Sequence, residues 1–286
     1  MRLFIAIAEE QGLTKAAARE SIAASAASKR LSDLEEDLEV QLFERSAKGM
    51  ALTAAGESLL RHARHILNAA HTLATELSQY RLGVRGYVRV LANLSAIVAF
   101  LPEDFESFFF MHPELRIELE ERPSSGVIRG VHEGWAEVGI CSGDADLAGL
   151  NAVTYRTDRF VLLMRPDHEL VGKGPLNYAD TLAFDQIGLH AESSIFVRSQ
   201  MAAREAGRPF NKRIHVPSFD AVCRTVQAGL GIALIPEPVF RILGQGMGLH
   251  FEELRDPWTV RELKLITRAG HALSAASQLL VDHLTR

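Results

Sequence analysis

Serine residues recur where predicted strands lead into predicted helices in the C-terminal two thirds of the chain. The four turns read NLSA, RPSS, HAESS and VPSFD. Helix N-termini present free N–H groups and partial positive charge, so hydroxyl-bearing turns of this kind can hold a small organic anion. Serine is also a common helix cap, and for any single turn simple capping is the simpler interpretation. The repetition at four turns predicts an anion-binding cleft that includes Ser95, Ser124, Ser125, Ser193, Ser194 and Ser218.

A different chemistry is indicated by SIAASAASKRLSDLEEDL, residues 21–38. One stripe of a helix from about Ala24 to Leu38 is apolar, with Ile22, Ala27, Leu31, Leu34 and Leu38. Its exposed edge is small, polar and weakly basic, with Ser25, Ser28, Lys29, Ser32 and Asp33. A DNA major groove is about 12 Å wide, and bulky or acidic residues there would strike bases or repel phosphates. The edge therefore predicts a helix that reads DNA.

Other elements are predicted around this helix. LFIAIAEE has apolar residues at helical spacing, and TKAAARES forms a second short helix that Thr14 can cap. Downstream, LFERSAKGMALT predicts a β-hairpin with a turn at Lys48 and Gly49. This hairpin would place Arg45 and Lys48 near DNA phosphates.

The motifs at residues 34–56 resemble those of LysR-type transcriptional regulators. In that family LEEELG, LFER and LTxAG follow the recognition helix in this order, and here LEEDLE, LFER and LTAAG do so. GLGIALIP and LPEDFESFFFMHPELRIELEE also resemble the effector-binding part of the family, so the resemblance extends from Leu3 to the last helix. It implies an N-terminal all-α winged helix-turn-helix domain at residues 1–57, a dimerising linker helix at 58–84 and a C-terminal α/β effector domain at 85–286. The effector domain would have two lobes and the periplasmic-binding-protein fold.

The predicted DNA contacts follow from the exposed edge, the hairpin and the resemblance. They are Thr14, Ser25, Ser28, Lys29, Arg30, Ser32, Arg45 and Lys48. The chain departs from the family at Glu20, where a Leu is usual, and at Ala23, Ala24 and Ser25, where Ser-Gln-Pro or Ser-Gln-Ser is usual. Loss of the Gln removes a side chain that can read a base with two hydrogen bonds. The operator sequence is therefore not implied by the resemblance.

Strands and helices alternate from Gly86 onward, which predicts parallel strands covered by helices. The first lobe is expected at about 86–157 and 268–286, and the second at about 158–267. The resemblance implies crossovers between the lobes near Arg156 to Asp158 and near Thr267. In the cleft between the lobes, Asn93 and His190 could add polar contacts and Phe219 an apolar wall.

The segment GESLLRHARHILNAAHTLATELSQYRLG predicts one long helix. Leu60, Leu67 and Ala74 form one seven-residue series, and Ala63, Ala70 and Leu77 form another. The seam predicts that this helix pairs with a second copy of the chain. A helix packed on its own domain is the alternative.

Catalysis is not predicted. The chain has no nucleophile elbow, phosphate-cradling glycine loop, HExxH motif or clustered metal ligands. The GxG in AGLGIA closes a helix and opens a strand, the reverse of a dinucleotide fingerprint, so it is expected to be a turn. No catalytic residue, metal site or cofactor is therefore assigned.

Composition sets the broad class. The formal net charge is −5, yet residues 1–85 hold equal numbers of basic and acidic residues, so the acidity lies in the remainder. Cys141 and Cys223 have no CxxC or Cys/His grouping and are expected to be buried in a protein of a reducing compartment. MRLFIAIAEEQG fits neither a signal peptide nor a transmembrane helix, which predicts a cytoplasmic protein without a membrane partner.

These patterns together predict a LysR-type regulator. It would bind a double-stranded DNA operator as a dimer or tetramer and respond to a small organic effector, expected to be anionic. The alternative is a solute-receptor-like protein that binds a small molecule without promoter activity. A cytosolic α/β enzyme is a third and weaker alternative.

Overall fold

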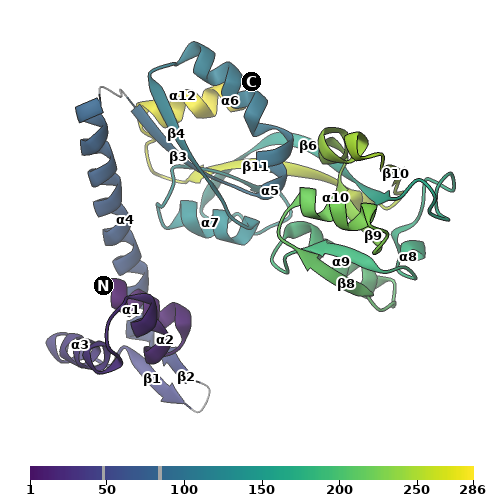
Figure 1. The fold of residues 1–286 in the computed structure, drawn as a ribbon. Helices are drawn as coiled ribbons and strands as arrows, with labels where there is room; N and C mark the ends of the chain where they lie inside the picture. Colours follow the sequence, from purple (N-terminus) through teal and green to yellow (C-terminus); the bar gives the residue numbers. More distant parts are fainter. Residues whose placement is uncertain (47–48, 83–85) are drawn as a thin grey trace. The chain divides into compact units, whose positions relative to one another are not determined.

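The computed structural model describes residues 1–46, 49–82 and 86–286, with the side chains at 45, 46, 65, 68, 71, 72 and 74–82 outside that description. The chain divides into two compact units (Figure 1). The N-terminal unit comprises Met1–Gly83 and Glu133–Trp135, and the C-terminal unit comprises Val84–His132 and Ala136–Arg286.

The N-terminal unit is a three-helix core with a hairpin and a long helix. Its elements are α1 (Arg2–Glu10), α2 (Leu13–Arg19), α3 (Ala24–Asp37), β1 (Phe43–Ser46), β2 (Gly49–Leu52) and α4 (Ala54–Leu82). Phe4, Ile7, Leu31 and Leu42 are buried together at its centre. Buried alanines, Ala16 among them, provide the small surfaces that let α1 and α2 approach closely.

Helix α3 begins at the predicted residue, Ala24, ends one residue earlier than predicted and has nearly the predicted buried stripe. Ala27 and Leu31 are buried, and Ile22 and Leu34 are half-buried. Leu38 was predicted to join this stripe and is instead exposed, because the helix ends at Asp37 and the chain turns away there.

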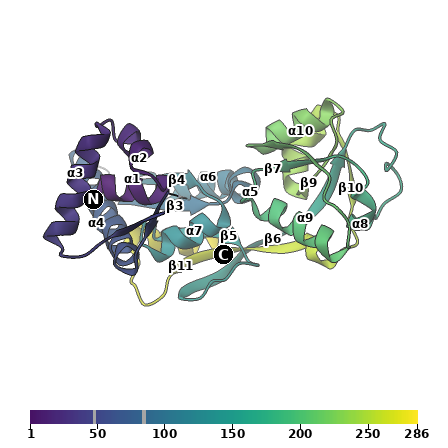
Figure 2. The same ribbon diagram turned by 90° about the horizontal axis from the view of Figure 1, so that it is seen from below.

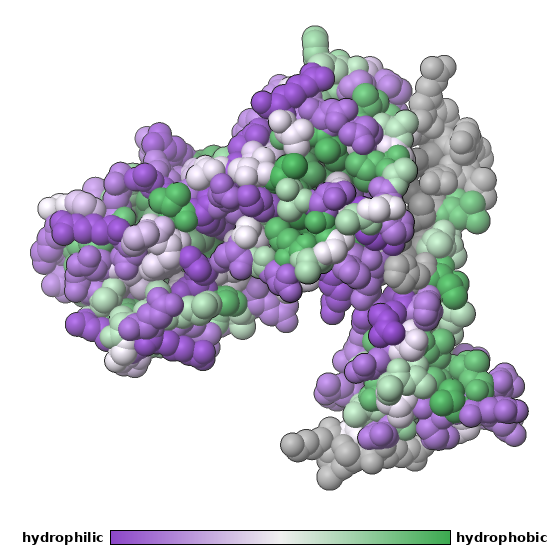
Figure 3. All heavy atoms as spheres, turned by 180° about the vertical axis from the view of Figure 1, so that it is seen from behind, coloured by the Kyte–Doolittle hydropathy of each residue, from purple (hydrophilic) through white to green (hydrophobic). Residues whose placement is uncertain are grey.

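The apolar seam of α4 differs from the predicted one. Ala63 is buried and Leu60 packs against the core of the N-terminal unit, so this part of the seam serves the chain's own domain. Among the described side chains, Ala70 of the predicted seam is exposed together with Ile66 (51% exposed) and Leu73 (56%), at helical spacing of four and three. Figure 3 shows apolar residues along this helix. The side chains of Ala74 and Leu77 lie outside the described residues.

The C-terminal unit is a mixed α/β structure. Its strands are β3 (Gly86–Ala92), β4 (Leu115–Glu121), β5 (Val138–Ser142), β6 (Leu150–Met164), β7 (Gln186–Leu189), β8 (Lys212–Val216), β9 (Ile232–Pro236), β10 (His250–Glu253) and β11 (Val260–Arg268). Its α-helices are α5 (Leu94–Ala99), α6 (Leu101–Met111), α7 (Ser124–His132), α8 (Tyr178–Thr181), α9 (Ser194–Glu205), α10 (Phe219–Gln227), α11 (Glu237–Val239) and α12 (Ala275–Leu284). A π-helix (Phe240–Gly244) and two 3-10 turns (Gln245–Met247, Pro257–Thr259) complete it.

The strands form two linked sheets, one in each lobe. Their order is β4-β3-β5-β11-β6-β9-β7-β8, with β10 also paired to β6. Parallel pairing joins β3 to β4 and β5, and β7 to β8 and β9, as the alternating pattern predicts. The long strands β6 and β11 are antiparallel to their neighbours and run from one lobe into the other.

The second crossover lies earlier than predicted. β11 already pairs with the first-lobe strand β5 from Leu263 onward, and Thr267 pairs with Asn151 inside the first lobe. The crossing is therefore near Arg261, opposite Asp158 on β6, and the predicted crossing near Thr267 is wrong. The strand is continuous through this point, so its sequence contains no turn signal to mark the change of lobe.

A buried ion pair joins the two crossing strands. The Arg261 Nε and Nη2 atoms donate to the two Asp158 carboxylate oxygens at 2.6 and 2.9 Å, and the guanidinium lies over the Phe160 ring. Their side chains are 7% and 1% exposed. Arg261 Nη1 is buried without a hydrogen-bond partner in the described part of the chain.

Helix α5 connects the two lobes through packing. It lies where the lobes meet in Figure 2, and its Leu94, Val98 and Ala99 pack against the core of the second lobe. In Figure 1, α6 and α12 cover one face of the first-lobe sheet and α7 covers the other. The strand ends that lead into α5 and α7 are therefore fixed by packing on both faces of the sheet.

Candidate nucleic-acid interface and ligand cleft

The outer edge of α3 is open to solvent. Ser25, Lys29 and Ser32 are exposed and Ser28 is half-buried, whereas Ala27 and Leu31 on the opposite side are buried. The helix N-cap is Ala23, and its side chain makes no capping hydrogen bond. Four small or flexible polar side chains thus share one accessible face at the N-terminal half of the helix.

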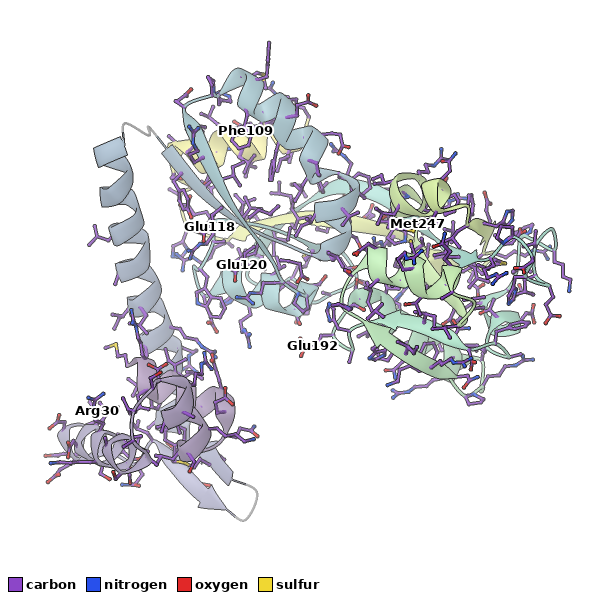
Figure 4. The ribbon with its side chains drawn as sticks, viewed as in Figure 1. Arg30, Phe109, Glu118, Glu120, Glu192 and Met247 are labelled. Carbon is purple, nitrogen blue, oxygen red and sulfur yellow. The ribbon has the colours of Figure 1, made fainter. Side chains whose placement is uncertain are left out.

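Arg30 and Thr14 lie differently from the sequence-based expectation. Arg30 is on the flank of α3 and lines a groove of about 500 Å³ with Glu20, Asp33 and Asp37 (Figure 4). Thr14 is exposed but does not cap α2, because the chain enters that helix through Gly12 and Thr14 is already its second residue. The predicted cap at Thr14 is therefore wrong.

The predicted hairpin is present next to α3. β1 and β2 pair antiparallel, with Ser46 opposite Gly49, so Gly49 begins the return strand. The Met50 N–H donates to the Gln11 carbonyl at 3.0 Å, which attaches the hairpin to the end of α1. Arg45 has its backbone in β1, but its side chain and the whole of Lys48 lie outside the described residues.

Three motif residues support this interface from behind. The Glu35 carboxylate accepts hydrogen bonds from the Leu42 N–H (2.7 Å) and the Phe43 N–H (3.3 Å), joining α3 to the start of β1. The Thr53 hydroxyl donates to the Gln41 carbonyl and accepts from the Gly56 N–H, capping α4. A Cβ at Gly56 would lie 2.1 Å from the Leu42 carbonyl oxygen, so only glycine fits. These residues belong to the motifs at 34–56, and their contacts were not predicted from the sequence.

Glu9 joins three helices of this unit. It accepts hydrogen bonds from Arg19 and Arg64, each at 2.8 Å. Burial alone would raise the pKa of Glu9, but the hydrogen bonds from Arg64 and Arg19 outweigh it and the pKa is lowered. A lowered carboxyl pKa contributes stability above the pKa of the unfolded chain, and that stability is lost as pH falls through the folded pKa. The packing of α1 on α2 and α4 is thus favoured at neutral pH.

A narrow cleft lies between the lobes of the C-terminal unit. Three strand-to-helix turns converge on it: β3 to α5, β4 to α7, and β7 to α9. Its lining consists of Asn93, Leu94, Ser95, Glu121, Pro123, Ser124, Leu189, His190, Ser193, Ser194 and Ile195. The free space is about 20 Å³, so a ligand larger than a water molecule requires the lining to open.

Several polar groups in this lining already make structural hydrogen bonds. Asn93 caps α5 through the Ala96 N–H (3.0 Å) and donates to the Ser124 hydroxyl (3.4 Å). Ser124 also accepts from the Ser142 N–H (3.0 Å), and Ser193 caps α9 through the Phe196 N–H (3.2 Å). Capping and ligand contact are therefore compatible roles, because each serine retains its O–H as a donor.

Ser95 adds a further hydroxyl to the cleft lining. It is 5% exposed, and its side chain has no hydrogen-bond partner in residues 1–46, 49–82 and 86–286. Its oxygen is not among the fully buried polar atoms that lack a partner, so the hydroxyl is accessible from the open part of the cleft. Ser95 therefore leaves a free hydroxyl at the cleft.

Three residues predicted at the cleft do not line it. Ser125 is exposed on the outer side of α7, one residue after Ser124. Phe219 is 1% exposed in the core of the second lobe, so it cannot form the predicted apolar wall. The turn before α10 that contains Ser218 does not contribute to the lining. Conversely, the lining residues Glu121 and Pro123 were missed, because neither is a typical anion ligand.

The remaining chemistry is limited. Among the described residues no group of three or more His, Cys, Asp or Glu could hold a metal ion. No helix in the described ranges is long and apolar enough to cross a membrane.

Both cysteines are buried and reduced. The two glycines of AGLGIA separate α10 from β9 and have positive φ, which confirms the predicted turn.

Comparisons with known proteins agree with this geometry. Residues 1–57 match the bacterial regulatory helix-turn-helix protein, lysR family, and residues 81–286 match the LysR substrate binding domain. The uncharacterized HTH-type transcriptional regulator YbhD of Escherichia coli K12 is 26% identical, over 97% of this chain and 87% of that protein.

Two solved structures share the fold. CbnR complexed with its target DNA has a TM-score of 0.65 at 22% identity, over 99% of this chain and 96% of that one. The regulatory domain of Synechocystis PCC6803 CcmR in complex with 2-PG also has a TM-score of 0.65 at 19% identity, over 70% of this chain and 96% of that one. Since the two family matches cover nearly the whole sequence, the chain belongs to the LysR family of transcriptional regulators.

Proposed function

We propose that this LysR-family protein binds a partly palindromic operator as a dimer or tetramer, and that a small organic effector in the cleft changes the spacing of its DNA-binding units. The proposed units are the winged helix-turn-helix at 1–57, a dimerising helix at 58–84 and the effector domain that follows. An effector can shift the balance between two arrangements only by its different affinity for each. The closed cleft supports this coupling, because a ligand must open the lining to enter.

The observation that carries the proposal is the exposed edge of α3 beside the β1–β2 hairpin, where Ser25, Ser28 and Lys29 precede the first acidic residue of the helix, Asp33. We propose that Ser25, Ser28, Lys29 and Ser32 approach base edges, and that Thr14, Arg30, Arg45 and Lys48 contact phosphates. Arg30 is proposed for a phosphate because it lies on the flank of α3. CbnR, which shares the fold, was solved in complex with its target DNA.

For the effector we propose contacts with Asn93, Ser95, Ser124, His190, Ser193 and Ser194. The convergence of these side chains on one cleft and the unpartnered hydroxyl of Ser95 support the assignment. The N-termini of α7 and α9 face the same cleft and favour an acid group on the ligand. CcmR, of the same fold, was solved with 2-PG.

We further propose that the exposed apolar stripe of α4 pairs with a second copy of the chain. The protein is inferred to act without catalysis and in the cytoplasm, where its operator is. Relatives described as transcriptional regulators support both inferences.

Gel-shift titration on the DNA upstream of the protein's own gene tests the proposal. We expect one preferred site with dyad symmetry, and uniform weak binding to all sequences would contradict it. Lys29→Ala should weaken operator binding about 10-fold or more, as for loss of a direct DNA contact.

The matched control is Lys173→Ala, which removes the same charge from an exposed loop of the second lobe. It should leave operator affinity within about twofold, and circular dichroism should show both variants folded. Equal losses in the two variants would mean that Lys29 acts only through net charge.

A further inference from the structure

Glu121 is an unpaired carboxylate in the cleft lining. It is the last residue of β4 and lies opposite Ala92 in the parallel ladder with β3, next to Asn93. Within the described residues its side chain has no hydrogen bond or ion pair. The adjacent arginine does not neutralise it, because Arg122 pairs with Glu120 on the other face of the strand.

A second carboxylate, that of Glu192, is adjacent in sequence to residues that line the cleft. Glu192 is exposed in the turn between β7 and α9, between His190 and Ser193, which both line the cleft (Figure 4). Among the described residues that line the cleft, none is Lys or Arg. The cleft therefore combines helix N-termini with a negatively charged rim.

The hydroxyl groups of the cleft are available mainly as hydrogen-bond donors. Ser124 and Ser193 already accept backbone hydrogen bonds, so they have O–H donors to offer, and the buried Ser95 can also donate. Such donors fit an acceptor such as a carboxylate. Glu121, when ionised, can only accept hydrogen bonds, so it fits a donor on the ligand and repels a second acid group.

We propose that the effector is a small zwitterion, with a carboxylate for the serine hydroxyls and helix N-termini and an ammonium group for Glu121. Glu121 is then a specificity-determining residue that selects amino acids over dicarboxylates. This inference rests on the proposed function, since it assigns the ligand class of the same cleft.

The test uses matched ligands and the full-length chain. The probes are the unbranched amino acids with a terminal amine from glycine to 6-aminohexanoate, each compared with the unsubstituted acid and the dicarboxylate of equal carbon number. Isothermal titration calorimetry is expected to find one amino acid that binds at least about tenfold more tightly than both of its partners. If no amino acid binds more tightly than its matched dicarboxylate, or if none binds, the proposal is overturned.

Two variants separate Glu121 from general electrostatics. Glu121→Gln keeps the side-chain size and should remove about tenfold of the affinity for the best amino acid, while the unsubstituted acid changes less than about twofold. Glu120→Gln, on the opposite face of the same strand, should change neither. Equal effects of the two variants would overturn the assignment. Operator binding is measured separately by gel shift. If the protein binds its operator but no amino acid binds preferentially, the ligand class is wrong and the regulator assignment stays in place.

Discussion

Individual residues in this protein make structural hydrogen bonds and can still offer polar groups to a ligand, and their surroundings decide which chemistry remains available. Asn93 and Ser124 hold the ends of two strands together, yet their hydrogen bonds leave donors at the cleft. The two cysteines show the opposite situation. Burial raises the pKa of Cys141 to about 12, with Asp144 adding to the effect, and raises that of Cys223 to about 11, with Asp220 adding to it. Thiolates are the reactive form, so both residues are protected.

We therefore expect hydrogen peroxide to leave the native protein unchanged. Intact-mass spectrometry should detect no oxidised cysteine, and operator affinity should stay within about twofold, because neither thiol ionises near neutral pH. Protein unfolded in urea is the control and should react at both sites. Oxidation of the folded chain with a changed gel shift would show that at least one thiol becomes accessible.

At the scale of elements, α4 divides along its length into a stretch that packs on its own unit and a stretch with an exposed apolar stripe. Its first turns complete the core of the N-terminal unit through Ala63 and Leu60. Farther along, Ile66, Ala70 and Leu73 form a stripe that the N-terminal unit leaves exposed. Ala63 and Ala70 are seven residues apart and lie on the same side of the helix, so the change from core to exposed stripe occurs along its length. The first stretch fits a helix packed on its own domain, and the second is the surface that we propose pairs with a second copy.

Charging this stripe should separate the protomers. Ile66→Asp with Leu73→Asp is expected to raise the dissociation constant of the dimer at least about 100-fold, because each apolar side chain of this size contributes about 1.5–3 kcal/mol when buried. Arg61→Asp, on the opposite side of α4, is the control and should leave the dimer intact. Sedimentation velocity measures the outcome, and an unchanged dimer in the double variant would place the interface elsewhere.

For the whole molecule, the connection between lobes is the decisive feature. Two continuous strands, β6 and β11, run side by side from one lobe into the other. The buried Asp158–Arg261 pair joins them at the crossing. Helix α5 adds packing from the first lobe onto the core of the second. The proposed opening of the cleft would therefore require bending or rotation at these few points.

Asp158→Asn should destabilise the C-terminal unit by about 3–5 kcal/mol, because it leaves the buried Arg261 charge without its partner. The neighbouring exposed pair provides the control. Arg159→Gln breaks the 3.2 Å contact with Glu253, which should cost about 0–1 kcal/mol. Urea unfolding followed by fluorescence of Trp258 and Trp135 measures both. Similar small losses would show that the crossing pair is not essential to stability.

Much of this protein could be predicted from sequence, and the successful parts are local. Helix α3 and its solvent-facing edge follow from periodicity, and the hairpin follows from its strand and turn residues. The serines at strand-to-helix turns also follow from capping chemistry. Each of these depends on neighbours within a few residues, which the chain displays directly.

The remaining features depend on which distant segments meet. Only the tertiary structure brings three serine turns into one cleft, excludes Ser218, and buries Phe219 in a core. It also adds Glu121, whose significance arises from its place beside Asn93 and not from its sequence context. The crossing at Arg261 and the division of α4 along its length are decided in the same way. Strand register and core packing are cooperative properties of the whole fold, so no short stretch of sequence specifies them.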